Sequence, residues 1–278
     1  MDMLRQFRQV DVFTATPYLG NPLAVVLGAD GLDTASMQQF ANWTNLSETT
    51  FVLPPRDEGA DYRVRIFTPS QELPFAGHPT LGTCHAWLEA GGKPREPGVI
   101  VQQCGAGLVP IQQDGEELRF AAPPLVRSGP VDEAVAVHIA ETLRVGRDDI
   151  VDLQWADNGP GWIAVLFRSA DEVLALRPGP VDLDLGVAGP YPPGSPAAFE
   201  VRAFTPKLAA TDEDPVTGSL NASLAQWLLA TGRARAPYTA SQGTVLGRKG
   251  KVRISTDADG GVWVGGSVVT CVSGTVEL

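Results

Sequence analysis

The sequence is poor in cysteine, histidine and basic residues. Its 278 residues include three histidines and three cysteines, Cys84, Cys104 and Cys271. An odd number of cysteines without metal-like spacing predicts reduced thiols in a cytoplasmic protein rather than a disulfide framework. Lys and Arg number 21 against 32 Asp and Glu, giving a net charge of −11. This charge argues against nucleic acid or an anionic membrane surface as the main partner.

Several motifs that would assign a chemistry are also missing. The sequence has no Gly-x-Ser-x-Gly nucleophile elbow, no phosphate loop ending in Gly-Lys-Ser/Thr, no His pair with zinc-ligand spacing and no dinucleotide fingerprint. No apolar run reaches about 18 residues, and residues 1–6 lack the basic-then-apolar pattern of a signal peptide. We therefore expect a cytoplasmic protein without membrane contact, a cofactor or a metal, which performs acid–base chemistry on a small molecule.

A strand-to-helix corner organises the first half of the chain. Residues 62–69 alternate as in a strand and lead to small residues that include Gly77 and His78. A helix-like run, residues 83–90, follows and stops at two glycines. The N-terminus of a helix presents unpaired backbone N–H groups and the positive end of the helix dipole, so this corner suits an anion.

The second half repeats this corner. Residues 201–206 read as the strand, Gly218 and Ser219 stand at the positions of Gly77 and His78, and a helix-like run reaches residue 230. A repeat of this length is too long for a solenoid unit and indicates two similar domains.

Each half combines many short strands with one main helix that is apolar on nearly all sides. Such a helix is expected to be enclosed by a strongly curved sheet. We therefore predict an α+β fold of two pseudo-symmetric domains, each a curved, mostly antiparallel sheet or open barrel around a central helix. The predicted domains are residues 1–124 and 125–278, with a boundary at the prolines of residues 122–125. The tail, residues 267–278, exceeds the repeat and is a candidate to cross back to the first domain.

Four side chains are candidates for chemistry, and each has a structural alternative. Glu48 lies in a turn before a buried strand, where burial would raise its pKa toward the range useful for proton transfer; its alternative is a turn or capping glutamate. His78 is either a site residue or a histidine that bonds the local backbone. Asp214 and Ser219 could contact a substrate or simply cap the second helix.

The residues at these positions resemble those of a known family, the phenazine-biosynthesis PhzF-like proteins. The resemblance lies in six segments that follow one another in order: residues 10–14, 20–25, 45–52, 65–69, 72–82 and 214–219. It implies two domains of the diaminopimelate epimerase fold with the site between them, a homodimer and no cofactor.

The resemblance also implies roles for individual residues. The best-understood family member isomerises a dihydro-hydroxyanthranilate by moving a proton along an allylic system. Its general acid/base corresponds to Glu48, its supporting histidine and aspartate to His78 and Asp214, and its serine at the second helix to Ser219. Related epimerases carry a cysteine just before each corner glycine. This chain has Ala76 and Thr217 there, so a two-cysteine racemase or epimerase is not expected.

Together these observations predict a cofactor-independent isomerase that moves a proton on a small amino or hydroxy acid bearing a carboxylate. Two alternatives from other classes stay open: a cyclase or dehydratase that uses the same glutamate, and a non-catalytic small-molecule binding protein of the same fold. The predicted catalytic residues are Glu48, His78 and Asp214, and the predicted substrate-binding residues are Ser47, Gly77, Gly218 and Ser219.

Overall fold

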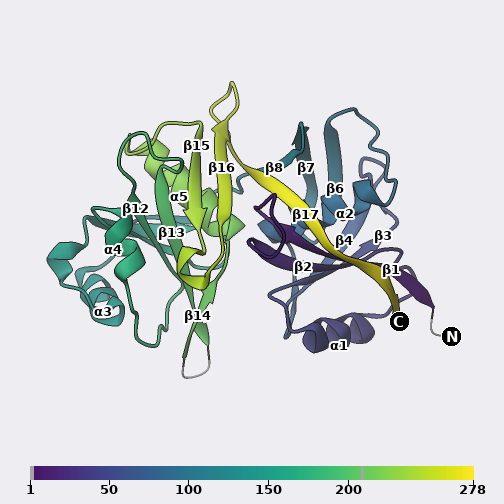
Figure 1. Ribbon diagram of the computed structural model, residues 1–278, viewed down its shortest axis with the longest axis horizontal. Coiled ribbons are helices and arrows are strands. Elements are labelled where there is room, and N and C mark those ends of the chain that lie inside the picture. Colours follow the sequence, from purple (N-terminus) through teal and green to yellow (C-terminus); the bar gives the residue numbers. More distant parts are fainter. Residues whose placement is uncertain (1–2, 208–209) are drawn as a thin grey trace. The chain divides into compact units, whose positions relative to one another are not determined.

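The computed structural model describes residues 3–207 and 210–278. Within these residues the chain forms two compact units (Figure 1). Unit 1 comprises the chain up to Ala121 together with Gly265–Leu278, and unit 2 comprises Ala122–Val264. No helix within the described residues is long and apolar enough to span a membrane.

Unit 1 is a barrel of strands around one helix. Its elements are β1 (Leu4–Val12), β2 (Asn21–Val26), α1 (Thr34–Thr44), β3 (Thr49–Leu53), β4 (Tyr62–Phe67), β5 (Glu72–Leu73), α2 (Gly77–Glu89), β6 (Val99–Cys104), β7 (Gly107–Asp114), β8 (Glu117–Ala121) and β17 (Val262–Glu277) from Gly265 on. The pairings run β1–β2, β2–β3, β3–β4, β4–β6, β6–β7, β7–β8, β8–β17 and β17–β1, which closes the ring. The pairs β2–β3 and β4–β6 of this ring are parallel.

Helix α2 fills the inside of this barrel. It contacts β1, β2, β3, β6 and β8, and its buried residues lie on all sides of the helix, which is the pattern of an enclosed helix. The closest approach is at Gly82, where a Cβ atom would lie 2.6 Å from Leu23 and 2.9 Å from Val12. Only glycine lets the helix lie this close to β1 and β2.

Unit 2 repeats the same plan. Its elements are β9 (Arg127–Pro130), α3 (Glu133–Leu143), the 3₁₀ turn η1 (Arg147–Asp149), β10 (Asp152–Asp157), β11 (Ile163–Leu166), α4 (Ala170–Ala175), β12 (Leu185–Pro190), β13 (Phe199–Lys207), β14 (Ala210–Asp214), α5 (Gly218–Ala230), β15 (Tyr238–Gln242), the 3₁₀ turn η2 (Thr244–Leu246), β16 (Gly250–Thr256) and the first residues of β17. The pairs β11–β12 and β13–β15 are parallel and match β2–β3 and β4–β6, while β10–β11, β12–β13 and β15–β16 are antiparallel.

The central helix of unit 2 is α5, and it is buried along its length in the same way. Here the close contact comes from the sheet: a Cβ atom on Gly186 of β12 would lie 2.0 Å from the side chain of Leu220. The predicted α+β architecture, a curved sheet around a central helix in each of two similar units, is therefore confirmed.

The start of α2 differs from the predicted one. The sequence predicts a helix over residues 83–90, whereas α2 begins at Gly77 and includes Pro79 and Gly82. Proline is tolerated there because the N–H groups of the first turn have no partner within the helix. The prediction of a helix N-terminus at Gly77 and His78 is thus correct. Pro79 and Gly82, which usually interrupt helices, made the helical segment look shorter in the sequence than α2 is.

Candidate functional site

Glu48 and His78 meet in unit 1. Glu48 directly precedes β3, and His78 is the second residue of α2. The Nε2 atom of His78 lies 3.2 Å from Oε2 of Glu48. The exposed fractions of the two side chains are 6% for the histidine and 15% for the glutamate. A carboxylate and an imidazole, separated by 30 positions in the sequence, are thus brought together at the start of the central helix, almost out of water.

Burial determines the charge of the histidine. It lowers the pKa of His78 to about 3, because removing the ring from water penalises the charged form. The imidazole is therefore neutral at neutral pH. Its other nitrogen, Nδ1, lies 3.4 Å from Nδ2 of Asn21, the fully buried first residue of β2. Among the described residues, Asn21 and Glu48 are the side chains that approach the two ring nitrogens.

A buried amide supports the first turn of α2. Gln102 of β6 donates from Nε2 to Thr80 Oγ1 at 2.9 Å and accepts from the Tyr62 hydroxyl at 3.0 Å. Thr80 in turn donates to the carbonyl oxygen of Ala76, which stands at the N-cap. Because the side chains of this network are fixed, the backbone around Gly77 and His78 is fixed as well.

Unit 2 builds its corner with the same kind of amide. Gln242 accepts from the backbone N–H of Thr217 and from Asn221 Nδ2, and it donates to the carbonyl of Asp214 and to Thr217 Oγ1, at distances between 2.8 and 3.1 Å. Thr217 Oγ1 donates to Asp214 Oδ2 at 2.5 Å. The side chain of Asp214 is therefore oriented by a hydroxyl whose own geometry is set by Gln242.

Ser219 lies at the second position of α5, as His78 does in α2. Its Oγ accepts a hydrogen bond from Trp162 Nε1 at 3.0 Å, and its carbonyl accepts one from Asn158 Nδ2 at 2.8 Å. Since the indole can only donate, the hydroxyl proton of Ser219 is left to donate elsewhere. This arrangement suits an acceptor such as a carboxylate at the helix N-terminus.

The predicted site residues thus fall into two local sets. In unit 1 Glu48, with Ser47 before it, contacts His78, which follows Gly77 at the start of α2, and in unit 2 Asp214 ends β14 shortly before Gly218 and Ser219 begin α5. Ser47 is exposed, while Gly77 and Gly218 are buried. The prediction that both sets serve one substrate stays a prediction.

The residues that hold these side chains could not be recognised from the sequence. Asn21 and Trp162 carry no motif of their own, and their partners lie 57 positions away along the chain in each case.

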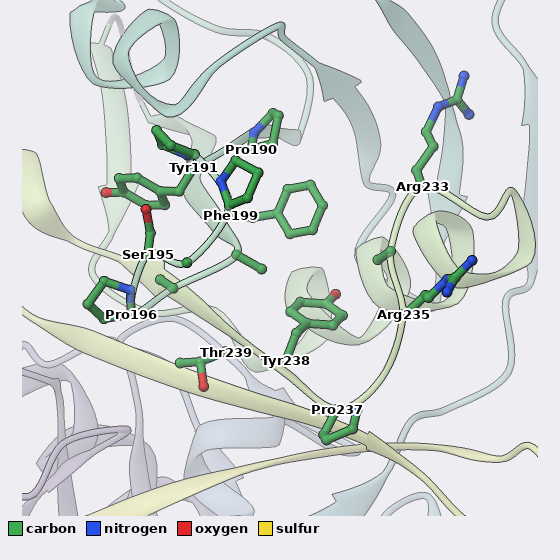
Figure 2. A pocket seen from close by; sticks show the side chains of 16 residues that line it. Pro190, Tyr191, Ser195, Pro196, Phe199, Arg233, Arg235, Pro237, Tyr238 and Thr239 are labelled. Atoms are coloured by element: carbon green, nitrogen blue, oxygen red, sulfur yellow. The ribbon is translucent and has the colours of Figure 1, made fainter.

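A separate pocket lies in unit 2. It has a volume of about 550 Å³ and is lined by the loop from Pro190 to Phe199 and the segment from Arg233 to Thr239, except Ala236. Figure 2 shows the rings of Phe199 and Tyr238 between prolines, with the guanidinium groups of Arg233 and Arg235 extending away from them. None of the seven predicted site residues lines this pocket. Among the described residues, no group of three or more His, Cys, Asp or Glu could hold a metal ion.

Comparison with known proteins places this chain in a family. The model of the family described as phenazine biosynthesis-like protein matches residues 10–274. "Antisense-enhancing sequence 1" of Schizosaccharomyces pombe is 36% identical, with 96% of this chain and 97% of that protein covered. The trans-2,3-dihydro-3-hydroxyanthranilate isomerase of Pseudomonas fluorescens is 32% identical, with 97% and 98% covered.

A solved structure agrees with this placement. The phenazine biosynthesis protein of the PhzF family from Bacillus anthracis superposes with a TM-score of 0.83 at 24% identity, over 99% of this chain and 100% of that one, which shows the shared fold. The relatives named isomerases confirm the prediction that the chain is an enzyme of the isomerase class. The chain belongs to the phenazine biosynthesis-like (PhzF) protein family.

Proposed function

We propose that this protein is a cofactor-independent isomerase that moves a proton within a small amino or hydroxy acid bearing a carboxylate, with Glu48 as the single general acid/base. The observation that carries the proposal is the contact between Glu48 and the neutral, buried ring of His78. A carboxylate that is largely removed from water and faces a hydrogen-bond donor can take up a proton and hold it without losing it to solvent.

The proposed reaction balances without a redox partner. Ionised Glu48 removes a proton from a carbon next to an unsaturated or carbonyl system, and the electron pair of the broken C–H bond moves into that system. The resulting carboxylic acid returns the same proton to another carbon, where a new C–H bond forms as the double bond shifts. Glu48 ends in its starting state. His78 would orient the carboxylate during both transfers.

The corner of unit 2 is proposed to bind substrate. Ser219 has a hydroxyl proton to donate, since its Oγ already accepts from Trp162. The N–H groups of the first turn of α5, at Gly218, add donors for a carboxylate, and those near Gly77 would do the same in unit 1. Asp214 is proposed to hold a substrate amine or hydroxyl, in an orientation fixed by Thr217. The role of Ser47, beside Glu48, is a further prediction.

Trans-2,3-dihydro-3-hydroxyanthranilate is the first compound to test, because relatives at 32–33% identity are named isomerases of it. It carries a carboxylate, an amine and a hydroxyl, as the proposed site requires. Purified protein is incubated with it, and proton NMR follows the position of the double bond. The panel then extends to other small amino and hydroxy acids, each examined for exchange of a carbon-bound proton.

The decisive variant is Glu48→Gln. It removes the basic oxygen while keeping the size of the side chain, and turnover is expected to fall by about 10²–10⁴-fold. The matched control is Glu58→Gln, which makes the same change at an exposed position of unit 1 and should keep wild-type turnover. Full turnover in Glu48→Gln would show that another group moves the proton.

Deuterium oxide separates the proposed proton shift from the alternatives. A shift within one enclosed site returns mainly the original proton, so little solvent deuterium enters the product. A product that has lost water would identify a dehydratase, and a product with a new ring would identify a cyclase. Binding detected by thermal shift without any carbon-bound exchange would indicate a binding protein.

A further inference from the structure

The contacts of the His78 ring point to a positioning residue outside the predicted catalytic set. We propose that Asn21 holds the His78 ring in the tautomer that carries its proton on Nε2, so that the ring donates this proton to the carboxylate of Glu48. The catalytic part of this inference rests on the proposed function, whereas the tautomer can be measured without a substrate.

The two contacts of the ring define the tautomer together. A neutral imidazole has one donor and one acceptor nitrogen. Nε2 faces the Glu48 carboxylate at 3.2 Å, and an ionised carboxylate can only accept, so Nε2 must carry the proton. Nδ1 is then an acceptor, which agrees with the amide nitrogen of Asn21 at 3.4 Å. The opposite arrangement would place two lone pairs against each other at the glutamate.

The backbone fixes where the Asn21 amide lies. Asn21 is the first residue of β2 and pairs with Val12 of β1, and its side chain is fully buried. The preceding Gly20 lies so close to β1 that a Cβ atom would be 2.2 Å from the Val12 carbonyl oxygen, and its N–H donates to Asp11 at 2.9 Å. Pro22 follows and restricts the chain further. Little freedom remains for the amide to move away from the ring.

The consequence for Glu48 is a fixed donor at one oxygen. A hydrogen bond to an ionised acceptor is among the strong ones, so a ring that donates from Nε2 would stabilise the ionised form of Glu48 and orient the carboxylate. If the ring carried its proton on Nδ1 instead, its lone pair would face the carboxylate and this support would be lost. Asn21 would therefore act on Glu48 through His78, without touching the reacting atoms.

The first test is the tautomer of the wild-type protein. Histidine is labelled with ¹⁵N in the full chain, which has only three histidines, and the His78 resonances are assigned by their loss in His78→Gln. Nδ1 is expected to resonate as an unprotonated, pyridine-like nitrogen and Nε2 as a protonated, pyrrole-like one. A pyrrole-like Nδ1 in the wild-type protein would overturn the proposal outright.

The second test reverses the polarity of the amide. In Asn21→Asp the nearest side-chain atoms can only accept, so Nδ1 is expected to become protonated, either in the other tautomer or in the imidazolium ion. Its resonance should move from pyridine-like to pyrrole-like. Asn42→Asp makes the same change at an exposed position of α1 and should leave both resonances in place. An unprotonated Nδ1 in folded Asn21→Asp would contradict the proposed role.

A third variant keeps the test decisive if the buried aspartate prevents folding. Asn21→Leu removes the donor without adding charge, and it is expected to let a pyrrole-like Nδ1 population appear beside the original one. If the ring kept its original tautomer alone, Asn21 would not be what selects it.

The kinetic consequence is measured with trans-2,3-dihydro-3-hydroxyanthranilate. Loss of one strong hydrogen bond to Glu48 is expected to lower kcat by about 10- to 100-fold in both Asn21 variants, with little change in KM and none in Asn42→Asp. A changed tautomer with unchanged kcat would leave Asn21 without a catalytic role. If instead Glu48→Gln kept full turnover, the proposed function would fail while the tautomer measurement still decided the role of Asn21 toward His78.

Discussion

Asp184 in unit 2 provides a test of the electrostatics around the second corner. It directly precedes β12, and its backbone carbonyl accepts from Ile163 at 2.9 Å. Burial, with the nearby Asp157 carboxylate as the second cause, raises the pKa of Asp184 from 3.8 to about 6. Asp157 itself accepts from the N–H groups of Gly159 and Gly161 at 2.7 and 2.8 Å, so it cannot easily move away.

The sign of the effect follows from linkage. Because the folded protein holds the proton of Asp184 more tightly than the unfolded chain, ionisation destabilises the fold. This cost is absent below pH 3.8, grows as the pH rises, and is complete above about pH 6. A fully shielded group would lose about 3 kcal/mol. Asp184 is only half-buried, and solvent screening reduces the expected loss to about 1 kcal/mol.

Asp184→Asn removes the charge and should remove the cost. Urea unfolding is measured at several pH values from 4 to 8. The variant is expected to gain about 1 kcal/mol over the wild type at pH 7.5, with the gain shrinking as the pH falls toward 4. Asp148→Asn, at an exposed position, serves as the control and should show no such trend. A gain in Asp184→Asn that is equal at pH 4 and pH 7.5, or absent at both, would refute the reasoning.

Three further predictions concern packing, an ion pair and thiol reactivity. Gly82→Ala should lower the free energy of unfolding by about 1–3 kcal/mol, because its Cβ would lie 2.6 Å from Leu23; a urea midpoint equal to that of the wild type would show that α2 can shift outward. Arg202→Met should cost about 1–3 kcal/mol, since it leaves the partly buried Glu213 without the guanidinium that binds both its oxygens at 2.9 and 2.8 Å; an unchanged unfolding midpoint would speak against this pair. Burial raises the pKa of Cys84, so its thiol should react slowly. When the native protein is treated with a thiol reagent, mass spectrometry should find the label on Cys104 and Cys271 first. Early labelling of Cys84 would contradict this prediction.

Much of the fold could be predicted because its signals are local. The strand-to-helix corners at Gly77 and Gly218 repeat along the chain, and the helices that follow are apolar on all sides. What could not be predicted depends on register. The amide of Asn21 reaches His78 only because β1 pairs with β2 and α2 lies against both. No spacing in the sequence encodes this contact.

The same limit applies to the candidate site. Glu48 could be singled out from its turn and from family resemblance. Its contact with a neutral imidazole could not, since the protonation state of His78 depends on how far the fold buries the ring. At Asp214 the sequence alone left a capping role open. The structure instead gives that carboxylate a hydroxyl donor from Thr217, the residue that stands where related epimerases carry a cysteine.

The pairing registers show that the two units carry a carboxylate at the same place. Thr49 pairs with Phe67 in unit 1 as Leu185 pairs with Phe204 in unit 2, so the residues just before them, Glu48 and Asp184, hold equivalent positions in the repeated fold.

Their neighbours differ in a way that separates their chemistry. In unit 1 the helix residue next to the carboxylate is His78, whose Nε2 lies 3.2 Å from Glu48 Oε2. In unit 2 that helix position is Ser219, whose Oγ accepts from Trp162 Nε1, and burial, with the charge of Asp157 as the second cause, raises the pKa of Asp184 to about 6. The duplication therefore supplies two carboxylates at equivalent positions in different surroundings: Glu48 lies 3.2 Å from a ring nitrogen of His78, whereas the equivalent helix position of unit 2 carries Ser219.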